Sequence, residues 1–242
     1  VGLGKTIEAG FIYQELNARN RLERVLVVCP SALRFKWQEE MSRRFGEEFR
    51  ILDSADMRQF LASIERLGPG IELKGICSLQ TLRGEDLHAR LEETLPPFDL
   101  VIVDEAHHMR NSATLSNKLG LTLSQIAEAM LLLTATPIHL GNENLFNLLR
   151  ILDSEEFEDP YIFQQTLLSN RYIIEADRLI CRGKPADLKK CKEILTRLES
   201  TPVRERFVNS PIYSGLIEKL ERYDGSERAK VIEIQRDIAQ LN

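Results

Sequence analysis

The first half of the chain alternates short apolar runs with segments of helical periodicity. The clearest apolar runs cover Leu100–Val103, Met130–Leu133 and Val25–Cys29. Continuous runs of this length are typical of strands that are buried on both faces, as in a parallel sheet covered by helices. Shorter strands are expected at Phe49–Leu52 and Gly75–Ser78. The pattern therefore predicts an α/β lobe built on an open parallel sheet.

One helix of this lobe can be placed from its apolar positions. Apolar side chains recur every four residues at Leu33, Trp37, Met41 and Phe45. At helical spacing they form one stripe, which would face the sheet. Ser31 stands just before the stripe and is expected to cap the helix. We expect Trp37 to be an ordinary core residue of this stripe.

The pattern changes after about Ser154. Strand-like runs disappear, charged residues increase, and helical periodicity continues to the last apolar face at Val231, Ile234, Ile238 and Leu241. This change predicts two parts. Residues 1–153 form the α/β lobe, and residues 154–242 form an α-helical appendage.

Composition narrows the class of protein. The chain has 242 residues, of which 43% are hydrophobic and 29% are charged, so it can bury a sizeable core. The net charge of −5 argues against a strongly basic nucleic-acid-coating surface, but not against a local binding groove. The four cysteines form no CxxC pair, which favours reduced packing residues in a cytoplasmic protein. No apolar run approaches the roughly 20 residues that span a membrane, so a membrane partner is not expected.

The chain opens with the residues VGLGKT. A glycine-rich turn followed by Lys-Thr at the start of a helix is typical of a phosphate-binding loop. Backbone N–H groups at Gly2 and Gly4 would close on phosphate oxygens, Lys5 would reach the β- and γ-phosphates, and the Thr6 hydroxyl would bind Mg²⁺. ATP and Mg²⁺ are therefore the expected cofactors. By itself, the short motif could also be a glycine-rich loop without a ligand.

A second motif, the DEAH box at residues 104–107, directly follows the apolar run that ends at Val103. Both acids would then emerge at the carboxyl edge of the sheet, where α/β proteins bind their ligands. Asp104 could hold Mg²⁺, while Glu105 orients and deprotonates the attacking water. Lys5, Asp104 and Glu105 are thus the predicted catalytic residues. The alternative, an acidic loop, is weakened by the buried strand before the motif.

A third element follows the last strong apolar run. The sequence TATP at residues 134–137 places two hydroxyls, Thr134 and Thr136, at a strand end. Hydroxyls at this edge could sense the state of the nucleotide and couple it to movement. The alternative is that they cap the next turn.

These motifs, in this order, resemble those of superfamily II helicase-like ATPases of the SWI/SNF type, in particular their RapA-like bacterial branch. The sequence LLLTATPIHLGNENLFNLLRIL at residues 131–152 is similar to the third motif of that family. The sequence CPSAL at residues 29–33, with Trp37 and Glu40, looks like motif Ia, and SLQTL at residues 78–82 looks like its next DNA-side motif. DEAHHMRN at residues 104–111 matches the extended second motif.

The resemblance implies the first of two RecA-like lobes, with ATP bound between them. Such proteins translocate on double-stranded DNA and remodel protein–DNA complexes, and transcription machinery is one candidate partner. The resemblance also implies that Ser31, Arg34, Gln80 and Thr81 contact the DNA backbone. The alternative for these four is that they are surface polar residues at helix starts. The helical appendage resembles the protrusion that this family inserts after its third motif.

Two expected parts of the ATP site lie outside this sequence. The strand that leads into the phosphate-binding loop would precede Val1, and the second lobe would supply arginines that complete the site. We therefore expect the isolated chain to be inactive. Two other functions remain open: a strand-separating helicase or restriction-type motor subunit, and a non-catalytic interaction module. Unwinding of a duplex would favour the first, and loss of the ATP-site residues would have favoured the second.

Overall fold

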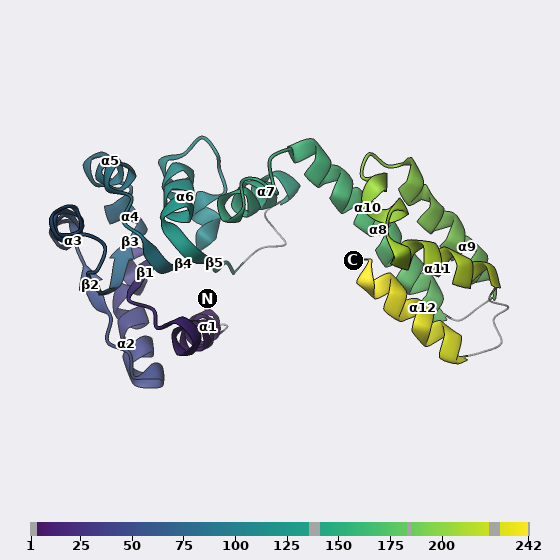
Figure 1. The fold of residues 1–242 in the computed structure, drawn as a ribbon, viewed down its shortest axis with the longest axis horizontal. Helices are drawn as coiled ribbons and strands as arrows, with labels where there is room; N and C mark the ends of the chain where they lie inside the picture. The colour runs from purple at the N-terminus through teal and green to yellow at the C-terminus, as the bar shows by residue number, and fades with distance from the viewer. Residues whose placement is uncertain (1–3, 136–140, 183–184, 223–227, 242) are drawn as a thin grey trace. The chain divides into compact units, whose positions relative to one another are not determined.

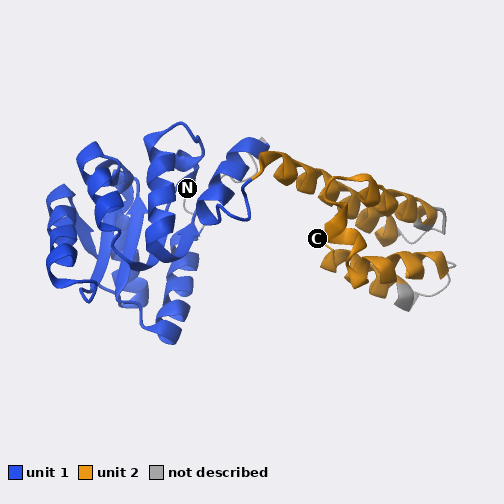
Figure 2. Cartoon of the chain, turned by 45° about the horizontal axis from the view of Figure 1, so that its top comes forward, with its two compact units in different colours: residues 1–158 blue, residues 159–242 orange. Residues whose placement is uncertain are grey.

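The chain divides into two compact units. The computed structural model describes residues 4–135, 141–182, 185–222 and 228–241. Residues 1–158 form one unit, called the sheet unit, and residues 159–242 form the other, called the helical unit (Figure 2). In the described residues, no helix is long and apolar enough to cross a membrane.

The sheet unit alternates strands and helices along the chain (Figure 1). The strands are β1 (Arg24–Cys29), β2 (Arg50–Leu52), β3 (Leu73–Ser78), β4 (Phe98–Val103) and β5 (Ala127–Leu132). The helices are α1 (Lys5–Asn20), α2 (Arg34–Phe45), α3 (Ser54–Leu67), α4 (Leu79–Leu82), α5 (Glu85–Thr94), α6 (Leu115–Ile126) and α7 (Gly141–Leu152). Two short 3-10 turns lie between them, η1 (Ser31–Leu33) and η2 (Ala106–Met109).

The strands form one sheet in the order β2-β3-β1-β4-β5, and all neighbours are parallel. Val28 of β1 lies opposite both Cys77 of β3 and Val103 of β4. The three strands therefore end at the same level, and the residues that follow them emerge at one edge. The predicted open parallel sheet, with a helical part after it, is confirmed.

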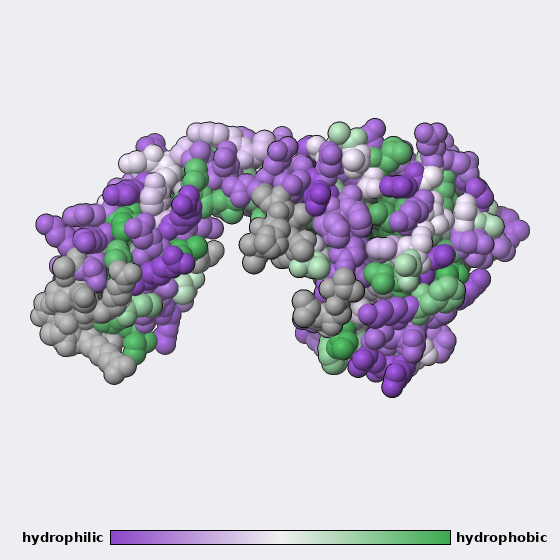
Figure 3. Space-filling model, turned by 180° about the vertical axis from the view of Figure 1, so that it is seen from behind, coloured by the Kyte–Doolittle hydropathy of each residue, from purple (hydrophilic) through white to green (hydrophobic). Residues whose placement is uncertain are grey.

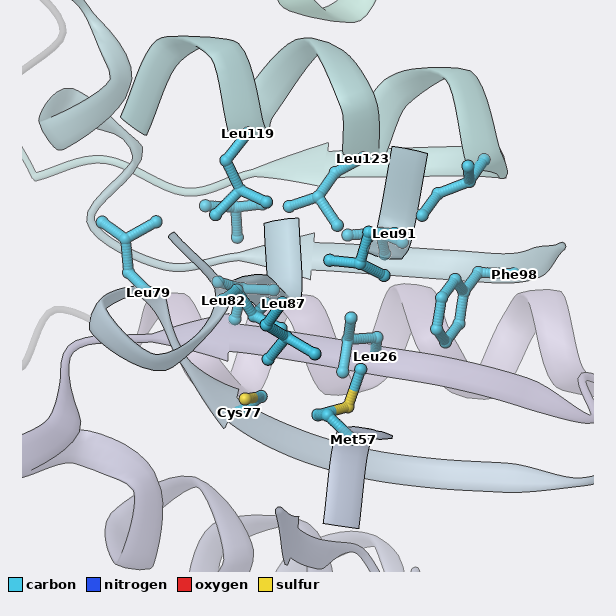
Figure 4. Packing of buried hydrophobic residues seen from close by; sticks show 14 of the residues in the cluster. Leu26, Met57, Cys77, Leu79, Leu82, Leu87, Leu91, Phe98, Leu119 and Leu123 are labelled. Atoms are coloured by element: carbon cyan, nitrogen blue, oxygen red, sulfur yellow. The ribbon is translucent and has the colours of Figure 1, made fainter. Parts of the chain in front are cut away.

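Both faces of the sheet are covered, which explains the continuous apolar runs. On β1, Val25 and Val27 belong to the cluster with α1 and α2, whereas Leu26 and Val28 belong to the cluster with α3, α5 and α6. Figure 4 shows the second cluster, with side chains of α6 directed at the strands. Because successive residues of a strand point to opposite faces, each of the residues from Val25 to Val28 meets an apolar layer.

Helix α1 lies close against α2 because it carries a glycine at the contact. A Cβ atom added to Gly10 would lie 2.0 Å from a ring atom of Phe45. The neighbouring ring of Phe11 packs edge-on against Phe45, with 5.6 Å between the ring centroids. This contact ties the helix that begins with the GLGKT motif to the helix that carries Trp37.

The start of α2 differs from the sequence prediction. The helix begins at Arg34, after the 3-10 turn η1, and no side chain caps it. The Ser31 hydroxyl points instead to another segment, so the predicted cap is wrong. The stripe itself is present, since Trp37 and Met41 are buried and Leu33 and Phe45 are half-buried.

Strand β5 forms one edge of the described sheet. Its apolar residues from Met130 to Leu132 are only half-buried, whereas β1 and β4 are almost completely buried. An edge strand has backbone N–H and C=O groups on one side without a partner strand.

Every described element of the helical unit is helical. Its helices are α8 (Pro160–Arg182), α9 (Pro185–Thr196), α10 (Arg204–Val208), α11 (Pro211–Arg222) and α12 (Arg228–Gln240), with the 3-10 turn η4 (Arg197–Ser200). They enclose one apolar core, which includes Ile173, Leu195, Leu216 and Ile238. The Tyr213 hydroxyl inside this core donates to the Leu195 carbonyl at 3.1 Å. Figure 3 shows that hydrophilic residues cover most of the visible surface of each unit, with small separate apolar patches.

Candidate nucleotide-binding site

Helix α1 begins directly after Gly4, so Lys5 and Thr6 occupy its first turn. Gly4 has a φ of 83°, a left-handed conformation that glycine adopts without strain. Its carbonyl accepts the N–H of Glu8 at 2.9 Å, which closes the first turn of the helix. The first N–H groups of such a helix have no partner within the helix, so they are available to an anion. Gly2, the other predicted glycine, lies outside the described residues.

The acidic pair stands at the end of β4 and faces this helix start. Asp104 continues the sheet, because its N–H donates to the Val28 carbonyl at 2.8 Å. Glu105 then adopts a φ of 53°, which is uncommon for a residue with a side chain. This turn brings both carboxylates to one cation: the Lys5 ammonium lies 2.8 Å from Glu105 Oε1 and 3.3 Å from Asp104 Oδ1.

The three charged side chains are largely shielded from water. The exposed fraction is 17% for Lys5, 6% for Asp104 and 14% for Glu105. Burial alone would lower the pKa of Lys5. The hydrogen bond to Glu105 and the charge of Asp104 outweigh that effect and raise this pKa above its ordinary value. Lys5 is therefore held as a cation. Charged side chains that are shielded from water are normally found paired with a group of opposite charge.

The acidic pair has a further partner that the sequence pattern did not identify. The indole Nε1–H of Trp37 donates to Asp104 Oδ2 at 3.0 Å. Trp37 is a core residue, as expected, but it also contacts the candidate site. The N–H of a buried tryptophan usually has a hydrogen-bond acceptor. The predicted burial of Trp37 therefore indicated that an acceptor exists, but not which residue it is.

A pocket of about 140 Å³ opens between α1, α2 and the end of β4. Its walls include both charged groups and apolar side chains. They are Gly4, Lys5, Thr6, Ile7, Leu33, Lys36, Trp37, Glu40, Arg44, Asp104 and Glu105. Phosphate groups are recognised by such a combination of a helix N-terminus and a lysine.

His107 lies on the other side of Glu105. Its Nδ1 is 3.1 Å from Glu105 Oε2, and its ring lies against that of His108 with 4.3 Å between the centroids. Burial lowers the pKa of His107, the nearby His108 lowers it further, and the charge of Glu105 opposes both effects only in part. His107 is therefore held mainly neutral beside the acid.

Thr134 follows Leu133, whose backbone is hydrogen-bonded to the residues just before and just after the acidic pair. The Leu133 N–H donates to the Val103 carbonyl at 2.8 Å, and the Ala106 N–H donates to the Leu133 carbonyl at 2.9 Å. Thr134 is thus at the same edge of the sheet as Asp104. Thr136, the second predicted coupling residue, lies outside the described residues.

The four predicted DNA-contacting residues lie together at the ends of β1 and β3. The Ser31 hydroxyl donates to Gln80 Oε1 at 3.1 Å, and Arg34 Nε donates to the Ser31 carbonyl at 3.3 Å. Thr81 is held by the N-terminal residue of its own turn, because its N–H donates to Ser78 Oγ at 3.0 Å. Strand pairing explains this grouping, since Cys29 and Ser78 lie opposite each other.

The residues around Asp104 suit a magnesium ion that is also bound by a phosphate group. They suit a metal ion held by protein side chains alone less well. Within the described residues, no group of three or more His, Cys, Asp and Glu side chains is placed to hold a metal ion. Mg²⁺ is typically bound by one or two carboxylates, waters and substrate phosphates. Asp104 and Thr6, which line the same pocket, could offer this partial set of oxygen ligands.

Comparison with known proteins identifies a family. Residues 1–208 match the SNF2-related domain family. The RNA polymerase-associated protein RapA of Serratia proteamaculans (strain 568) is 40% identical over 189 residues, which are 76% of this chain and 19% of that protein. RapA of Yersinia pestis (strain Pestoides F) has the same identity and coverage. The chain therefore spans about a fifth of the length of these curated relatives.

A solved structure has a similar fold. The Sulfolobus solfataricus SWI2/SNF2 ATPase core in complex with dsDNA is similar with a TM-score of 0.50 and 16% identity. The match covers all of this chain and 52% of that one. At this level of identity the match supports the fold of the chain alone.

Proposed function

The chain belongs to the SNF2-related domain family, and we propose that it is the ATP-binding lobe of a DNA-dependent ATPase. In this proposal the enzyme translocates on double-stranded DNA and remodels protein–DNA complexes. One observation carries the proposal: Lys5 at a helix start meets Asp104 and Glu105 at the end of β4, beside a pocket. This is the arrangement that phosphate binding and water activation require.

Each residue of the site has a proposed role. Gly2, Gly4 and Lys5 bind the phosphates, and Thr6 and Asp104 hold Mg²⁺. Bound Mg²⁺·ATP supplies the phosphoryl group and the cation that neutralises its charge. Glu105 orients the attacking water and accepts its proton. Before nucleotide binds, the Lys5 ammonium pairs with both carboxylates, and a phosphate oxygen would then compete with them for this group.

A DNA surface is proposed at the ends of β1 and β3. Ser31, Arg34, Gln80 and Thr81 offer donors there, and donors of this kind contact phosphates without reading sequence. Support comes from their shared position in the fold. The SWI2/SNF2 ATPase core that has a similar fold is described as a complex with dsDNA. Thr134 and Thr136 are proposed to couple the nucleotide state to this surface.

A second lobe of the same parent protein is proposed to complete the site. Its arginines would stabilise the charge that develops during phosphoryl transfer, an effect of about 10³–10⁵ in rate for arginine fingers. We therefore expect the isolated chain to hydrolyse ATP near background. The relatives named RNA polymerase-associated support a transcription complex as the partner of the parent protein, and a cytoplasmic location follows from that.

ATP hydrolysis by the full-length parent tests the proposal. With DNA present, Glu105→Gln should reduce phosphate release by about 10²–10⁴-fold, because general-base catalysis is worth that much. Lys5→Ala should also cause a large loss, because it removes the cation that contacts the phosphates. Lys118→Ala and Glu128→Gln are matched controls, since both side chains are exposed on the same unit. A parent protein that is indifferent to Glu105→Gln would overturn the role of this carboxylate.

The same preparation separates the proposal from its two alternatives. A strand-displacement assay on a forked duplex should show no unwinding by a translocase, and efficient unwinding would favour a strand-separating helicase or a restriction-type motor. Absence of ATP binding by the parent, measured by calorimetry, would favour a non-catalytic interaction module.

A further inference from the structure

The single tryptophan of the chain is in contact with the acidic motif. We propose that Trp37 is a positioning residue, whose indole N–H fixes the Asp104 carboxylate in the orientation that binds magnesium. This inference rests on the proposed function, in which Asp104 holds Mg²⁺. It assigns to the helix α2 a part in the metal site, although no atom of Trp37 would touch the metal.

The two carboxylate oxygens of Asp104 have different partners. Oδ2 accepts the indole N–H of Trp37 at 3.0 Å. Oδ1 accepts the backbone N–H of Glu105 at 2.8 Å and lies 3.3 Å from the Lys5 ammonium. A donor on each oxygen prevents rotation of the carboxylate about its last bond. Oδ1 faces Lys5, so in this proposal it is the oxygen that binds the metal once Lys5 has moved to a phosphate.

Trp37 is itself held in place from several sides. Its side chain is 1% exposed and belongs to the cluster that packs α1 and α2 on the sheet. Met41, one turn later on the same face of α2, is completely buried. A donor on a packed helix keeps its direction, so it orients Asp104 better than a surface side chain or a water would.

Trp37→Phe removes the N–H and keeps an aromatic ring in the core. Oδ2 would then lose its donor in a buried position, where an unpaired acceptor is unfavourable. Loss of an outer partner of a metal ligand typically costs 10–100-fold in metal affinity or activity. In the full-length parent we therefore expect the Mg²⁺ concentration for half-maximal ATP hydrolysis to rise by about 10–100-fold. The rate at saturating Mg²⁺ should fall less.

Tyr13→Phe is the matched control. Tyr13 is equally buried in the same cluster and also carries a polar atom on its ring, but it packs against Phe49 and lies under the Lys74 ammonium. The control should leave the Mg²⁺ dependence unchanged. A Trp37→Phe protein with the same Mg²⁺ requirement as the wild type would overturn the inference.

A spectroscopic measurement on the 242-residue chain tests the contact without activity. Because there is one tryptophan, the ¹H–¹⁵N spectrum holds a single indole Nε1–H resonance, so its assignment needs no variant of Trp37. Asp104→Asn replaces the charged acceptor by a neutral one, which accepts a weaker hydrogen bond. The resonance should move upfield and its exchange with water should become faster, whereas Tyr13→Phe should leave it in place.

The two tests distinguish failure of this inference from failure of the proposed function. If Asp104→Asn changes neither the chemical shift of the indole resonance nor its exchange with water, the contact is absent. That result overturns the inference but leaves the proposed function standing. A wild-type parent that neither binds nor hydrolyses ATP overturns the proposed function and this inference with it. Because the spectrum is recorded with the tryptophan in place, a Trp37→Phe variant that fails to fold does not remove the test.

Discussion

The sheet unit contains a charged cluster that is shielded from water, whereas each ion pair described in the helical unit includes a partly exposed side chain. In the sheet unit, Asp104 is 6% exposed and meets the cation of Lys5 away from bulk water. In the helical unit, Lys219 pairs with Asp237 and Glu233 on the surface, and its side chain is 39% exposed. Removing charges from water is unfavourable and adds little net stability, whereas exposed pairs are nearly neutral. The shielded cluster is therefore the stronger candidate for a functional site, because stability alone does not account for it.

Buried polar groups are distributed in the same way. Among the described buried polar residues, all except Ser169 lie in the sheet unit. Each unit has an apolar core of its own, yet the buried charges of the described residues meet across distant segments only in the sheet unit. Within the described residues, the shielded charged cluster therefore lies in the sheet unit, where the candidate site is at the edge of the sheet.

The largest expected effect concerns whether the two cores are independent. Trp37→Ala should destabilise the sheet unit by about 3–5 kcal/mol, and Leu216→Ala should destabilise the helical unit by about 2–5 kcal/mol. Hydrogen exchange measured by mass spectrometry should show faster exchange only in the unit that carries the change. Ile232→Ala, at an exposed position, is the control and should have little effect. Faster exchange in both units would show that they unfold as one body.

Thiol reactivity should next distinguish one exposed cysteine of the helical unit from the buried cysteines of both units. Burial raises the pKa of Cys29, Cys77 and Cys191 to about 12 in each case. Cys181 on α8 is exposed. Because the thiolate is the reactive form, each of the three buried thiols should react more than about 100-fold more slowly than Cys181 at pH 8. Mass spectrometry after brief alkylation should find one label, in the helical unit, and Cys181→Ser should abolish it. Rapid labelling of Cys29 would contradict the buried state of the sheet.

A smaller effect is expected on DNA binding. The isolated chain should bind duplex DNA weakly and with steep salt dependence, because a net charge of −5 leaves only a local groove to contact phosphates. Arg34→Ala should reduce the salt slope by about one unit, as expected for one lost phosphate contact. Arg178→Ala removes the same charge from the helical unit and should leave the slope unchanged. Fluorescence anisotropy at several salt concentrations measures this, and tight, salt-insensitive binding would contradict it.

The smallest effect should follow removal of a surface pair. Lys219→Met breaks the contacts with Asp237 and Glu233, but Lys219 itself is 39% exposed, so water screens both pairs. We expect no shift of the denaturation midpoint beyond experimental error, at low or high salt. A clear loss of stability would show that the helical unit depends on its charges, and the contrast between the two units would then fail.

Much of the fold could be predicted from local pattern. The apolar runs predicted at Val25–Cys29 and Leu100–Val103 correspond to β1 and β4, because a strand covered on both faces must be apolar at every position. The strand predicted at Met130–Leu133 is observed as Ala127–Leu132, so its boundary was missed. That strand is at the edge of the described sheet, where the burial pattern is weaker.

The site was predictable only in part, since long-range contacts leave no local pattern. The convergence of Asp104 and Glu105 on Lys5 follows from strand ends and a turn, and the sequence indicated both. The bond from Trp37 to Asp104 joins residues 67 positions apart, and the hydroxyl of Ser31 reaches Gln80 across 49 positions. Helical spacing identified Trp37 as buried, but only the packing of α2 on the sheet determines its acceptor.

The short distance along the start of α2 has a mechanical consequence. Arg34, in the proposed DNA surface, and Trp37, which holds Asp104, are three residues apart on one rigid helix, or about 4.5 Å along its axis. Under the proposed function, one helix therefore carries both a residue of the DNA surface and the residue that orients the metal-binding carboxylate. A shift of the α2 backbone on DNA binding would bear on both sites at once, without a hinge between them.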